Sequence, residues 1–179
     1  VIEAEKIFLN VGARPFVPDL KGLEDVDYLT SSSMMEVDFL PKHLIIIGGS
    51  YIGLEFGQMY RRFGSEVTIV ERGDRLIPRD DPDVSEAVRS FLEKEGVRVR
   101  LNAECIHLAK KGGGVAVQVD CDDEPSEILG SHLLLAVGRI PNTDALGLET
   151  AGVTANGRGY IEVDDQLRTN VPGIWALGD

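Results

Sequence analysis

Apolar residues follow two rhythms along this chain, and each rhythm predicts a different kind of element. Short apolar runs occupy 6–11, 44–47 and 132–137, and the run at 44–47 is rich in β-branched residues. Such runs are typical of strands buried in a parallel sheet. Apolar residues recur at three- and four-residue spacing in 51–63 and again after Pro82, which predicts two helices. The alternation of strands and helices predicts an α/β fold with a Rossmann-like parallel sheet.

Each predicted helix has an apolar stripe that we expect to pack against the sheet. The stripe of the first helix consists of Ile52, Phe56, Met59, Tyr60 and Phe63. The second helix begins with Asp81 and Pro82 and ends at Gly96, and its stripe consists of Val84, Ala87, Val88, Phe91 and Leu92. The capping-box spacing of Ser33 and Glu36 also predicts a short helix before Pro41.

Between the second helix and the run at 132–137, the pattern changes to strict alternation. It predicts one long strand over 97–108 and further strands at 115–119 and 127–129, with turns at 112–114 and 122–126. A three-stranded antiparallel β-meander therefore replaces the helix of one ordinary crossover.

The segment 44–71, LIIIGGSYIGLEFGQMYRRFGSEVTIVE, carries the most specific chemistry. A strand, the turn Gly48-Gly49-Ser50-Tyr51-Ile52-Gly53, a helix and a second strand ending at Glu71 follow one another directly. This order predicts a dinucleotide site in which the first helical turn faces a pyrophosphate. Gly48 permits the sharp turn, and Gly53 lets the helix pack close to the sheet. Glu71 follows Gly53 by 71 − 53 = 18 residues, near the spacing of about 20 expected for a carboxylate that holds the adenosine ribose.

Serine stands where the usual G-x-G-x-x-G motif has its second glycine. The Cβ of Ser50 is expected to displace the ligand slightly outward, and its hydroxyl could offset this by donating to a phosphate oxygen. A glycine-rich turn in an α/β domain that binds no nucleotide is the alternative. The register of strand, helix and acid argues against that alternative.

Composition narrows the classes of partner. The formal net charge of −12 argues against nucleic acid, because such binding depends on cationic groups that neutralise phosphates. No apolar run approaches the length of a membrane span. Cys105 and Cys121 form no C-x-x-C pair and are typical of reduced thiols in a cytoplasmic protein, and we expect no metal site. No signal peptide precedes the first strand and both ends interrupt strand patterns, so we interpret the chain as a segment of a longer protein.

An internal repeat relates the two ends of the sequence. Residues 7–24, IFLNVGARPFVPDLKGLE, are similar to residues 133–149, LLLAVGRIPNTDALGLE. In each copy an apolar strand ends in Val-Gly, a proline lies three residues after the glycine, and Gly-Leu-Glu follows. The repeat indicates two dinucleotide-binding folds, of which one is complete here. Coincidence among common strand residues is the alternative.

The final residues, 169–179, read TNVPGIWALGD. Together with the two Val-Gly motifs and GGSYIGLE, they resemble the flavin-dependent pyridine nucleotide-disulfide oxidoreductases, such as dihydrolipoamide dehydrogenase, glutathione reductase and mercuric reductase. The resemblance covers essentially the whole chain. It implies an FAD/NAD(P)-binding fold in which 1–41 leave an FAD domain, 42–150 form an NAD(P)H-binding domain and 151–179 return to the FAD domain. We expect the strands near 7–11 and 174–177, from the incomplete FAD domain, to pair together, pair with another copy or be mobile.

The resemblance implies an oxidoreductase in which NAD(P)H passes hydride to FAD and the flavin reduces an active-site disulfide, which then reduces a disulfide or Hg(II). It also implies a homodimer. The redox cysteine pair, the FAD glycine motif and the dimerisation domain are not in this sequence, so the segment alone is expected to bind the nicotinamide dinucleotide and to catalyse nothing. A flavin reductase without the disulfide, of NADH oxidase or ferredoxin reductase type, and a non-catalytic nucleotide-sensing module are the alternatives.

The resemblance also implies roles for single residues. Tyr51 matches an aromatic residue that covers the nicotinamide site in some members and swings aside when the cofactor enters. Glu55 matches a glutamate paired with a lysine beside the flavin, with a solvated helix glutamate as the alternative. The backbones of Gly138 and Cys105 would approach the nicotinamide end and border the adenine. Asp179 would hold the FAD ribityl chain. The turn residues that would line the pyrophosphate are Gly48, Gly49, Ser50, Tyr51, Ile52 and Gly53.

The choice between NADH and NADPH depends on neighbouring residues. Glu71 accepts hydrogen bonds from a free 2′-hydroxyl and repels a 2′-phosphate, which favours NADH. Arg72 falls where NADPH-using relatives carry a phosphate-binding arginine, with Arg75 and Arg79 nearby. A surface cation on a loop is the alternative role for Arg72. Ser50 resembles the mercuric reductase branch, which commonly uses NADPH. We predict NADH, with NADPH as the alternative.

Overall fold

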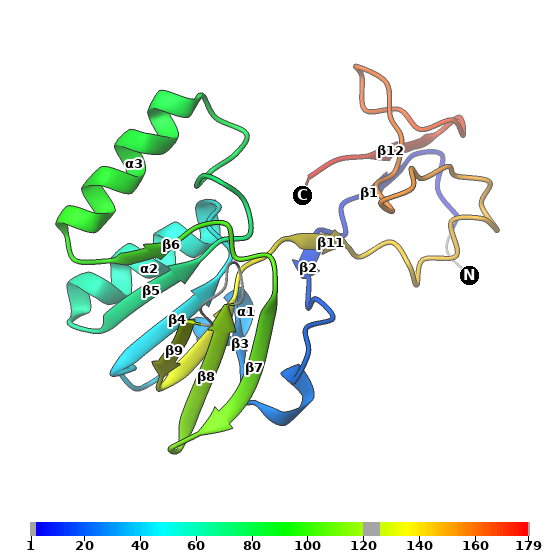
Figure 1. Ribbon diagram of the computed structural model, residues 1–179. Helices are drawn as coiled ribbons and strands as arrows, with labels where there is room; N and C mark the ends of the chain where they lie inside the picture. Colours follow the sequence, from blue (N-terminus) through cyan, green and yellow to red (C-terminus); the bar gives the residue numbers. More distant parts are fainter. Residues whose placement is uncertain (1–2, 120–125, 179) are drawn as a thin grey trace. The chain divides into compact units, whose positions relative to one another are not determined.

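The computed structural model describes residues 3–119 and 126–178 of the chain (Figure 1). Residues 122–125 of the predicted turn, together with Cys121 and Asp179, lie outside the described residues. The chain divides into two compact units, one made of Val1–Arg14 and Arg139–Asp179 and the other of Pro15–Gly138.

The larger unit is built on a five-stranded sheet with the order β3-β10-β4-β5-β6. Every neighbouring pair is parallel, which confirms the predicted parallel sheet. The chain winds outward from β4 to β5 and β6 and then returns to β10 on the other side of β4. The winding direction therefore reverses between β4 and β10. The strands are β3 (Leu29–Thr30), β4 (His43–Ile47), β5 (Glu66–Val70), β6 (Arg98–Arg100) and β10 (His132–Leu135).

Two helices cover one face of this sheet (Figure 1). The helix α2 (Tyr51–Phe63) connects β4 to β5, and its bounds agree with the prediction. Its buried face differs from the predicted stripe, because Phe63 is 62% exposed. The residues buried on α2 are Gly53, Leu54, Gly57 and Tyr60. Small residues on this face allow a close approach to the sheet.

The helix α3 (Pro82–Lys94) connects β5 to β6 and begins after Asp81, as predicted. Its predicted stripe is largely wrong, because Val84 and Phe91 are each 43% exposed. Leu92 of the predicted stripe is buried, and Val88 packs against the core. Ser85, which was not predicted, is also buried. The Ser85 hydroxyl donates to the Leu76 carbonyl at 2.8 Å, and this bond satisfies a polar side chain inside the packed face.

A three-stranded antiparallel sheet in the order β7-β8-β9 covers the opposite face, which confirms the predicted meander. The single strand predicted over 97–108 is wrong, because the chain forms β6, breaks, and continues as β7. The break lies at Asn102, whose φ is 57°. The next amide, of Ala103, donates to the Glu71 carbonyl at 3.0 Å rather than to a neighbouring strand. The strands are β7 (Ile106–Lys111), β8 (Gly114–Val119) and β9 (Ser126–Gly130).

Two short helical elements precede β4. The 3-10 helix η1 covers Leu23–Asp25, and the helix α1 covers Ser31–Met34. The capping box of α1 joins Thr30 to Ser33, so the predicted pairing of Ser33 with Glu36 is wrong and began three residues too late. Among the residues that the structure describes, no helix has both the length and the apolar character needed to cross a membrane.

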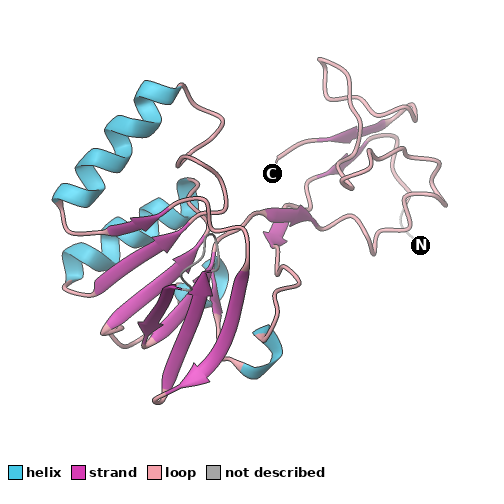
Figure 2. Cartoon of the chain, viewed as in Figure 1, coloured by secondary structure: helices cyan, strands magenta, loops and turns pink. Residues whose placement is uncertain are grey.

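In the smaller unit, β1 (Ile7–Leu9) pairs in parallel with β12 (Ile174–Ala176). Of the three outcomes expected for these strands, the structure shows that they pair with each other. The predicted burial of the first strand is wrong, because Phe8 is 62% exposed. Its ring stacks on Trp175 with the centroids 5.2 Å apart. Much of this unit is loop and turn (Figure 2).

The two copies of the internal repeat continue into paired strands. The strand β2 (Ala13–Pro15) pairs with β11 (Arg139–Pro141), and each follows the glycine of one copy. The backbone hydrogen bonds are reciprocal, because Phe16 N donates to Gly138 O at 2.9 Å and Asn142 N donates to Gly12 O at 3.0 Å. Equivalent positions of the repeat therefore make equivalent bonds, which favours a structural origin of the repeat over coincidence.

Candidate functional site

The turn between β4 and α2 requires glycine at two positions. Gly48 has a φ of 114°, and a Cβ there would lie 2.4 Å from the Ala136 carbonyl oxygen. A Cβ at Gly53 would lie 2.1 Å from the Gly48 carbonyl oxygen. The sharp turn and the close packing predicted for these glycines are therefore both present, at the carboxyl ends of β4 and β10.

The first turn of α2 lacks a side-chain cap. Ser50 is the N-cap residue, but its hydroxyl makes no capping hydrogen bond. The first intrahelical bond runs from Leu54 N to Ser50 O at 3.1 Å, so the three preceding amides, from Tyr51 to Gly53, have no helical acceptor. Their N–H groups and the helix dipole make this position suitable for an anion such as a pyrophosphate.

Glu71 follows β5 directly and is half-buried. Its Oε2 accepts the Gly49 N–H at 2.6 Å, and its Oε1 accepts the Gly73 N–H at 2.8 Å. The carboxylate therefore joins the glycine turn to the loop after β5, a role that the sequence pattern did not predict. Each carboxylate oxygen keeps a second acceptor position for a ligand hydroxyl.

The loop 71–81 lies against the same turn. Ile77 N donates to the Gly49 carbonyl at 2.9 Å, and Ile77 is only 5% exposed. Its φ of 39° is unusual for a β-branched residue. No sequence signal pointed to this residue, because isoleucine rarely adopts such a conformation.

The ring of Tyr51 is 49% exposed at the start of α2. Its hydroxyl donates to Asp80 Oδ2 at 2.7 Å, which fastens the loop 71–81 to the helix. This hydrogen bond raises the pKa of Tyr51, because it stabilises the protonated phenol. The sequence did not predict this contact, because no motif relates Asp80 to Tyr51.

The predicted charged residues of the site lie on its surface. Arg72 is exposed and has no hydrogen-bond or ion-pair partner among the described residues. Arg75 donates to the Pro78 carbonyl at 3.0 Å. Glu55 is exposed on α2 and likewise has no such partner in the described part of the chain. The structure thus leaves both Arg72 and Glu55 accessible to groups from outside this chain.

Other predicted residues are dispersed. Cys105 is an exposed free thiol, and it lies between β6 and β7 rather than inside the predicted strand. Gly138 has a φ of 141°, and its carbonyl accepts the Phe16 N–H. Within residues 3–119 and 126–178, no group of three His, Cys, Asp or Glu side chains could hold a metal ion.

The sequence resembles proteins of known family over its whole length. A family model described as pyridine nucleotide-disulphide oxidoreductase matches residues 1–179. Mercuric reductase from Streptomyces lividans is 40% identical over 99% of this chain and 37% of that protein. Dihydrolipoyl dehydrogenase from Thermus scotoductus is 39% identical over 98% of this chain and 39% of that protein.

Solved structures with similar folds agree with these matches. The HOCl-induced flavoprotein disulfide reductase RclA from Escherichia coli has a TM-score of 0.89 and 37% identity, over 99% of this chain and 40% of that chain. LpdA from Mycobacterium tuberculosis has a TM-score of 0.82 and 33% identity, over 98% of this chain and 38% of that chain. The chain thus spans between 37% and 40% of the length of these proteins. The predicted FAD/NAD-binding fold is confirmed, and the chain belongs to the pyridine nucleotide-disulphide oxidoreductase family.

Proposed function

We propose that this chain forms the NAD(P)H-binding part of an FAD-dependent oxidoreductase and holds the nicotinamide for hydride transfer to FAD. The proposal rests on the β4–α2 turn, where uncapped helical amides lie beside the carboxylate at the end of β5. Parallel α/β sheets bind ligands beyond the carboxyl ends of their strands, where the winding direction reverses. In this sheet that position lies between β4 and β10.

The residues at this edge fit a dinucleotide. Gly48 and Gly53 keep side chains out of the turn, and the amides from Tyr51 to Gly53 would donate to the pyrophosphate. The Ser50 hydroxyl would add a further donor. The acceptor positions of Glu71 that its two amide bonds leave unused suit the hydroxyls of the adenosine ribose.

Other roles are proposed from the family. The Tyr51 ring would cover the nicotinamide position, and the backbones of Cys105 and Gly138 would border the adenine and the nicotinamide end. Glu55 would pair with a lysine beside the flavin, and Asp179 would hold the ribityl chain of FAD. When bound, FAD would supply the electron-accepting group.

We propose the domain boundaries implied by the family, with 42–150 as the NAD(P)H-binding domain and 1–41 and 151–179 as parts of the FAD domain. The compact unit of Pro15–Gly138 contains residues 42–138 of the proposed NAD(P)H-binding domain, which supports its central part, and it also contains residues 15–41. The β1–β12 pair would belong to the sheet of the FAD domain.

We propose NADH as the hydride donor, because Glu71 would repel a 2′-phosphate. We also propose that the full-length protein is a cytoplasmic homodimer. The physiological acceptor would be a disulfide or Hg(II). Mercuric reductase and dihydrolipoyl dehydrogenase resemble this chain almost equally, at 40% and 39% identity. The proposal therefore concerns the half-reaction that such enzymes share, the reduction of FAD by a nicotinamide dinucleotide.

The test uses the FAD-loaded protein at its full natural length. Anaerobic stopped-flow measurement of flavin reduction gives the Kd of NADH and of NADPH. We expect Glu71→Ala to weaken NADH binding by about tenfold, as for the loss of one hydrogen bond to a charged group. Arg72→Ala is expected to change the Kd of NADH by less than about twofold, because its contribution would be to a 2′-phosphate.

The control is Arg89→Ala, whose side chain pairs with Glu93 on the outer surface of α3. Absence of flavin reduction by either dinucleotide in the unmodified protein would overturn the proposed function. Tighter binding of NADPH than of NADH, weakened by Arg72→Ala, would overturn the choice of NADH and retain the function.

A further inference from the structure

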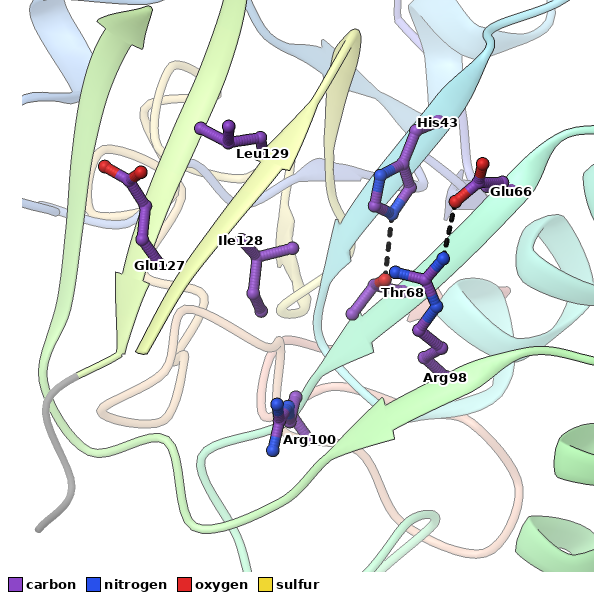
Figure 3. Close-up of a pocket in the computed structure, with 8 residues that line it drawn as sticks. All are labelled: His43, Glu66, Thr68, Arg98, Arg100, Glu127, Ile128 and Leu129. Atoms are coloured by element: carbon purple, nitrogen blue, oxygen red, sulfur yellow. Dashed lines mark hydrogen bonds and ion pairs between the residues drawn. The ribbon is translucent and has the colours of Figure 1, made fainter. Parts of the chain in front are cut away.

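A cavity of about 330 Å³ opens where β4, β5 and β6 begin, and β9 forms one of its walls (Figure 3). His43, Glu66 and Arg98, the first residues of the three parallel strands, lie along it. The glycine turn follows the opposite end of β4, and Glu71 follows the same end of β5. Each of these strands has five residues, and a rise of about 3.3 Å per residue makes the two ends roughly 15 Å apart. The cavity and the proposed dinucleotide site are therefore separate.

The floor of the cavity is polar and fixed. Thr68 is 2% exposed on a sheet face whose other central residues are apolar. Its hydroxyl lies 2.8 Å from His43 Nε2, and this hydrogen bond accounts for a buried polar side chain at this position. Burial, followed by the positive charge of Arg98, lowers the pKa of His43. The imidazole is therefore neutral near pH 7 and acts as a hydrogen-bonding group.

Most charges of the lining are already paired. Arg98 Nη2 lies 2.5 Å from Glu66 Oε2, and Figure 3 shows this pair beside His43 and Thr68. Glu127 Oε2 lies 2.6 Å from Lys111 Nζ. Arg100 has no ion pair and no side-chain hydrogen bond among the residues that the structure describes. Within residues 3–119 and 126–178, the lining therefore carries one positive charge without a counter-charge.

An unpaired guanidinium at the edge of a polar cavity favours a ligand with two oxygens in one plane, because its N–H groups donate in parallel. The opposite wall is apolar where the side chain of Ile128 on β9 faces the parallel sheet, whereas the exposed side chain of Leu129 lies on the other face of that strand. A ligand that satisfies both walls has an anionic head and a short hydrocarbon part. The small volume excludes a dinucleotide-sized molecule.

We propose that this cavity binds a small oxyanion, with its charged oxygens on Arg100 and its remainder against Ile128. A short-chain carboxylate and inorganic phosphate share the oxyanion chemistry, and the apolar wall favours the carboxylate. The site is independent of the proposed dinucleotide site, so both can be filled at once.

The test titrates the full-length protein with butyrate and, separately, with inorganic phosphate in a buffer free of other oxyanions. Calorimetry gives the Kd, and the NMR resonances of the His43 imidazole report on the cavity floor. Arg100→Gln removes the charge at similar length, and Arg89→Gln on α3 is the matched control. We expect Arg100→Gln to weaken binding by about tenfold, as for one charge-assisted hydrogen bond, and the control to bind as the unmodified protein does.

If butyrate binds and phosphate displaces it, the ligand is a short-chain carboxylate. If phosphate binds and butyrate does not, the ligand is inorganic phosphate. Unchanged His43 resonances at saturation, or equal affinity in Arg100→Gln, would overturn the proposal. If Arg100→Gln does not fold, Thr68→Val supplies the second variant. It preserves the β-branched shape and removes the hydroxyl, so binding should weaken while the affinity for NADH stays within about twofold of the unmodified value.

Discussion

Glu71 holds two loops together even when no ligand is bound. Its two oxygens accept amide protons from Gly49 in the loop after β4 and from Gly73 in the loop after β5. Hydrogen bonds to a charged acceptor are stronger than neutral ones, and amides left without an acceptor are costly when buried. The residue that would recognise the ribose thus also fixes the turn that would receive the pyrophosphate.

The first prediction concerns stability. Glu71→Ala leaves both amides without this acceptor and is expected to lower the free energy of unfolding by about 2 kcal/mol. Glu71→Gln keeps one carbonyl oxygen and should lower it by roughly half as much. Urea denaturation measures both values. Glu55→Ala, on the exposed side of α2, is the control and should change stability by less than about 0.5 kcal/mol. Equal losses for Glu55→Ala and Glu71→Ala would contradict the structural role.

The second prediction concerns pH. The pKa of His43 lies below its ordinary value of 6.5, chiefly because of burial. The unfolded chain therefore binds more protons than the folded chain between the lowered pKa and 6.5, so stability decreases as the pH falls through that window. Burial also lowers the pKa of His132, which adds to the same effect.

We expect the Tm of the unmodified protein to fall as the pH is lowered from 7.5 to 5.5. The Tm of His43→Gln should fall by a smaller amount over the same range. The Tm of His132→Gln should still fall by the amount that the titration of His43 causes. The carboxyl groups with lowered pKa values, such as Asp144 and Asp164, lose their stabilisation only below about 3.8, outside this window. A slope that His43→Gln leaves unchanged would contradict the assignment.

Among the elements, the contact of α2 with the sheet depends on the size of two residues. A Cβ at Gly53 would meet a backbone oxygen at 2.1 Å, whereas a Cβ at Gly57 would meet the flexible end of Ile69 at 3.1 Å. Backbone cannot move aside as a side-chain terminus can. The same substitution on the same helix should therefore have unequal effects.

The third prediction compares these two positions. Gly53→Ala should destabilise the protein by about 2–3 kcal/mol, because the crowding exceeds the gain in helix propensity. Gly57→Ala should stay within about 1 kcal/mol of the unmodified protein, because that gain offsets a mild contact. Urea denaturation distinguishes the two. A smaller loss for Gly53→Ala than for Gly57→Ala would contradict the packing described for α2.

The sequence predicted best the elements that are determined by residues close together along the chain. The bounds of α2, the glycine turn and the meander all follow from spacing or turn residues. The face of α3 was mispredicted because its apolar residues exceed what the sheet covers, and a hydroxyl bond places Ser85 inside. The strand predicted over 97–108 failed at Asn102, where the backbone bonds the loop after β5 rather than a strand.

The same distinction applies to the sites. Gly48, Gly53 and Glu71 were identified because a motif fixes their order along the chain. The bond between Tyr51 and Asp80 and the cavity beside Thr68 join residues that no spacing relates. Such contacts depend on the register between strands and loops, which a periodic pattern does not encode.

At the scale of the whole molecule, the two units differ in how much they bury. The central strands of the larger unit carry fully buried side chains, such as Ile45 and Ile69, which are both 0% exposed. In the smaller unit the β1–β12 pair buries Ala176 but leaves Phe8 62% exposed. Since burial of apolar surface is the main source of stability, the smaller unit should unfold first in the 179-residue chain taken alone.

Trp175 makes this difference measurable, because it is the only tryptophan of the sequence and lies in β12. Its fluorescence reports on the smaller unit, whereas far-ultraviolet circular dichroism is dominated by α2 and α3 of the larger unit. We expect the fluorescence transition at a lower urea concentration than the dichroism transition, and β1 and β12 amides to exchange about a hundredfold faster than those of β4. Phe8→Ala, which removes the ring stacked on Trp175, should move only the fluorescence transition. Coincident transitions in both proteins would mean that the two units unfold as one cooperative structure.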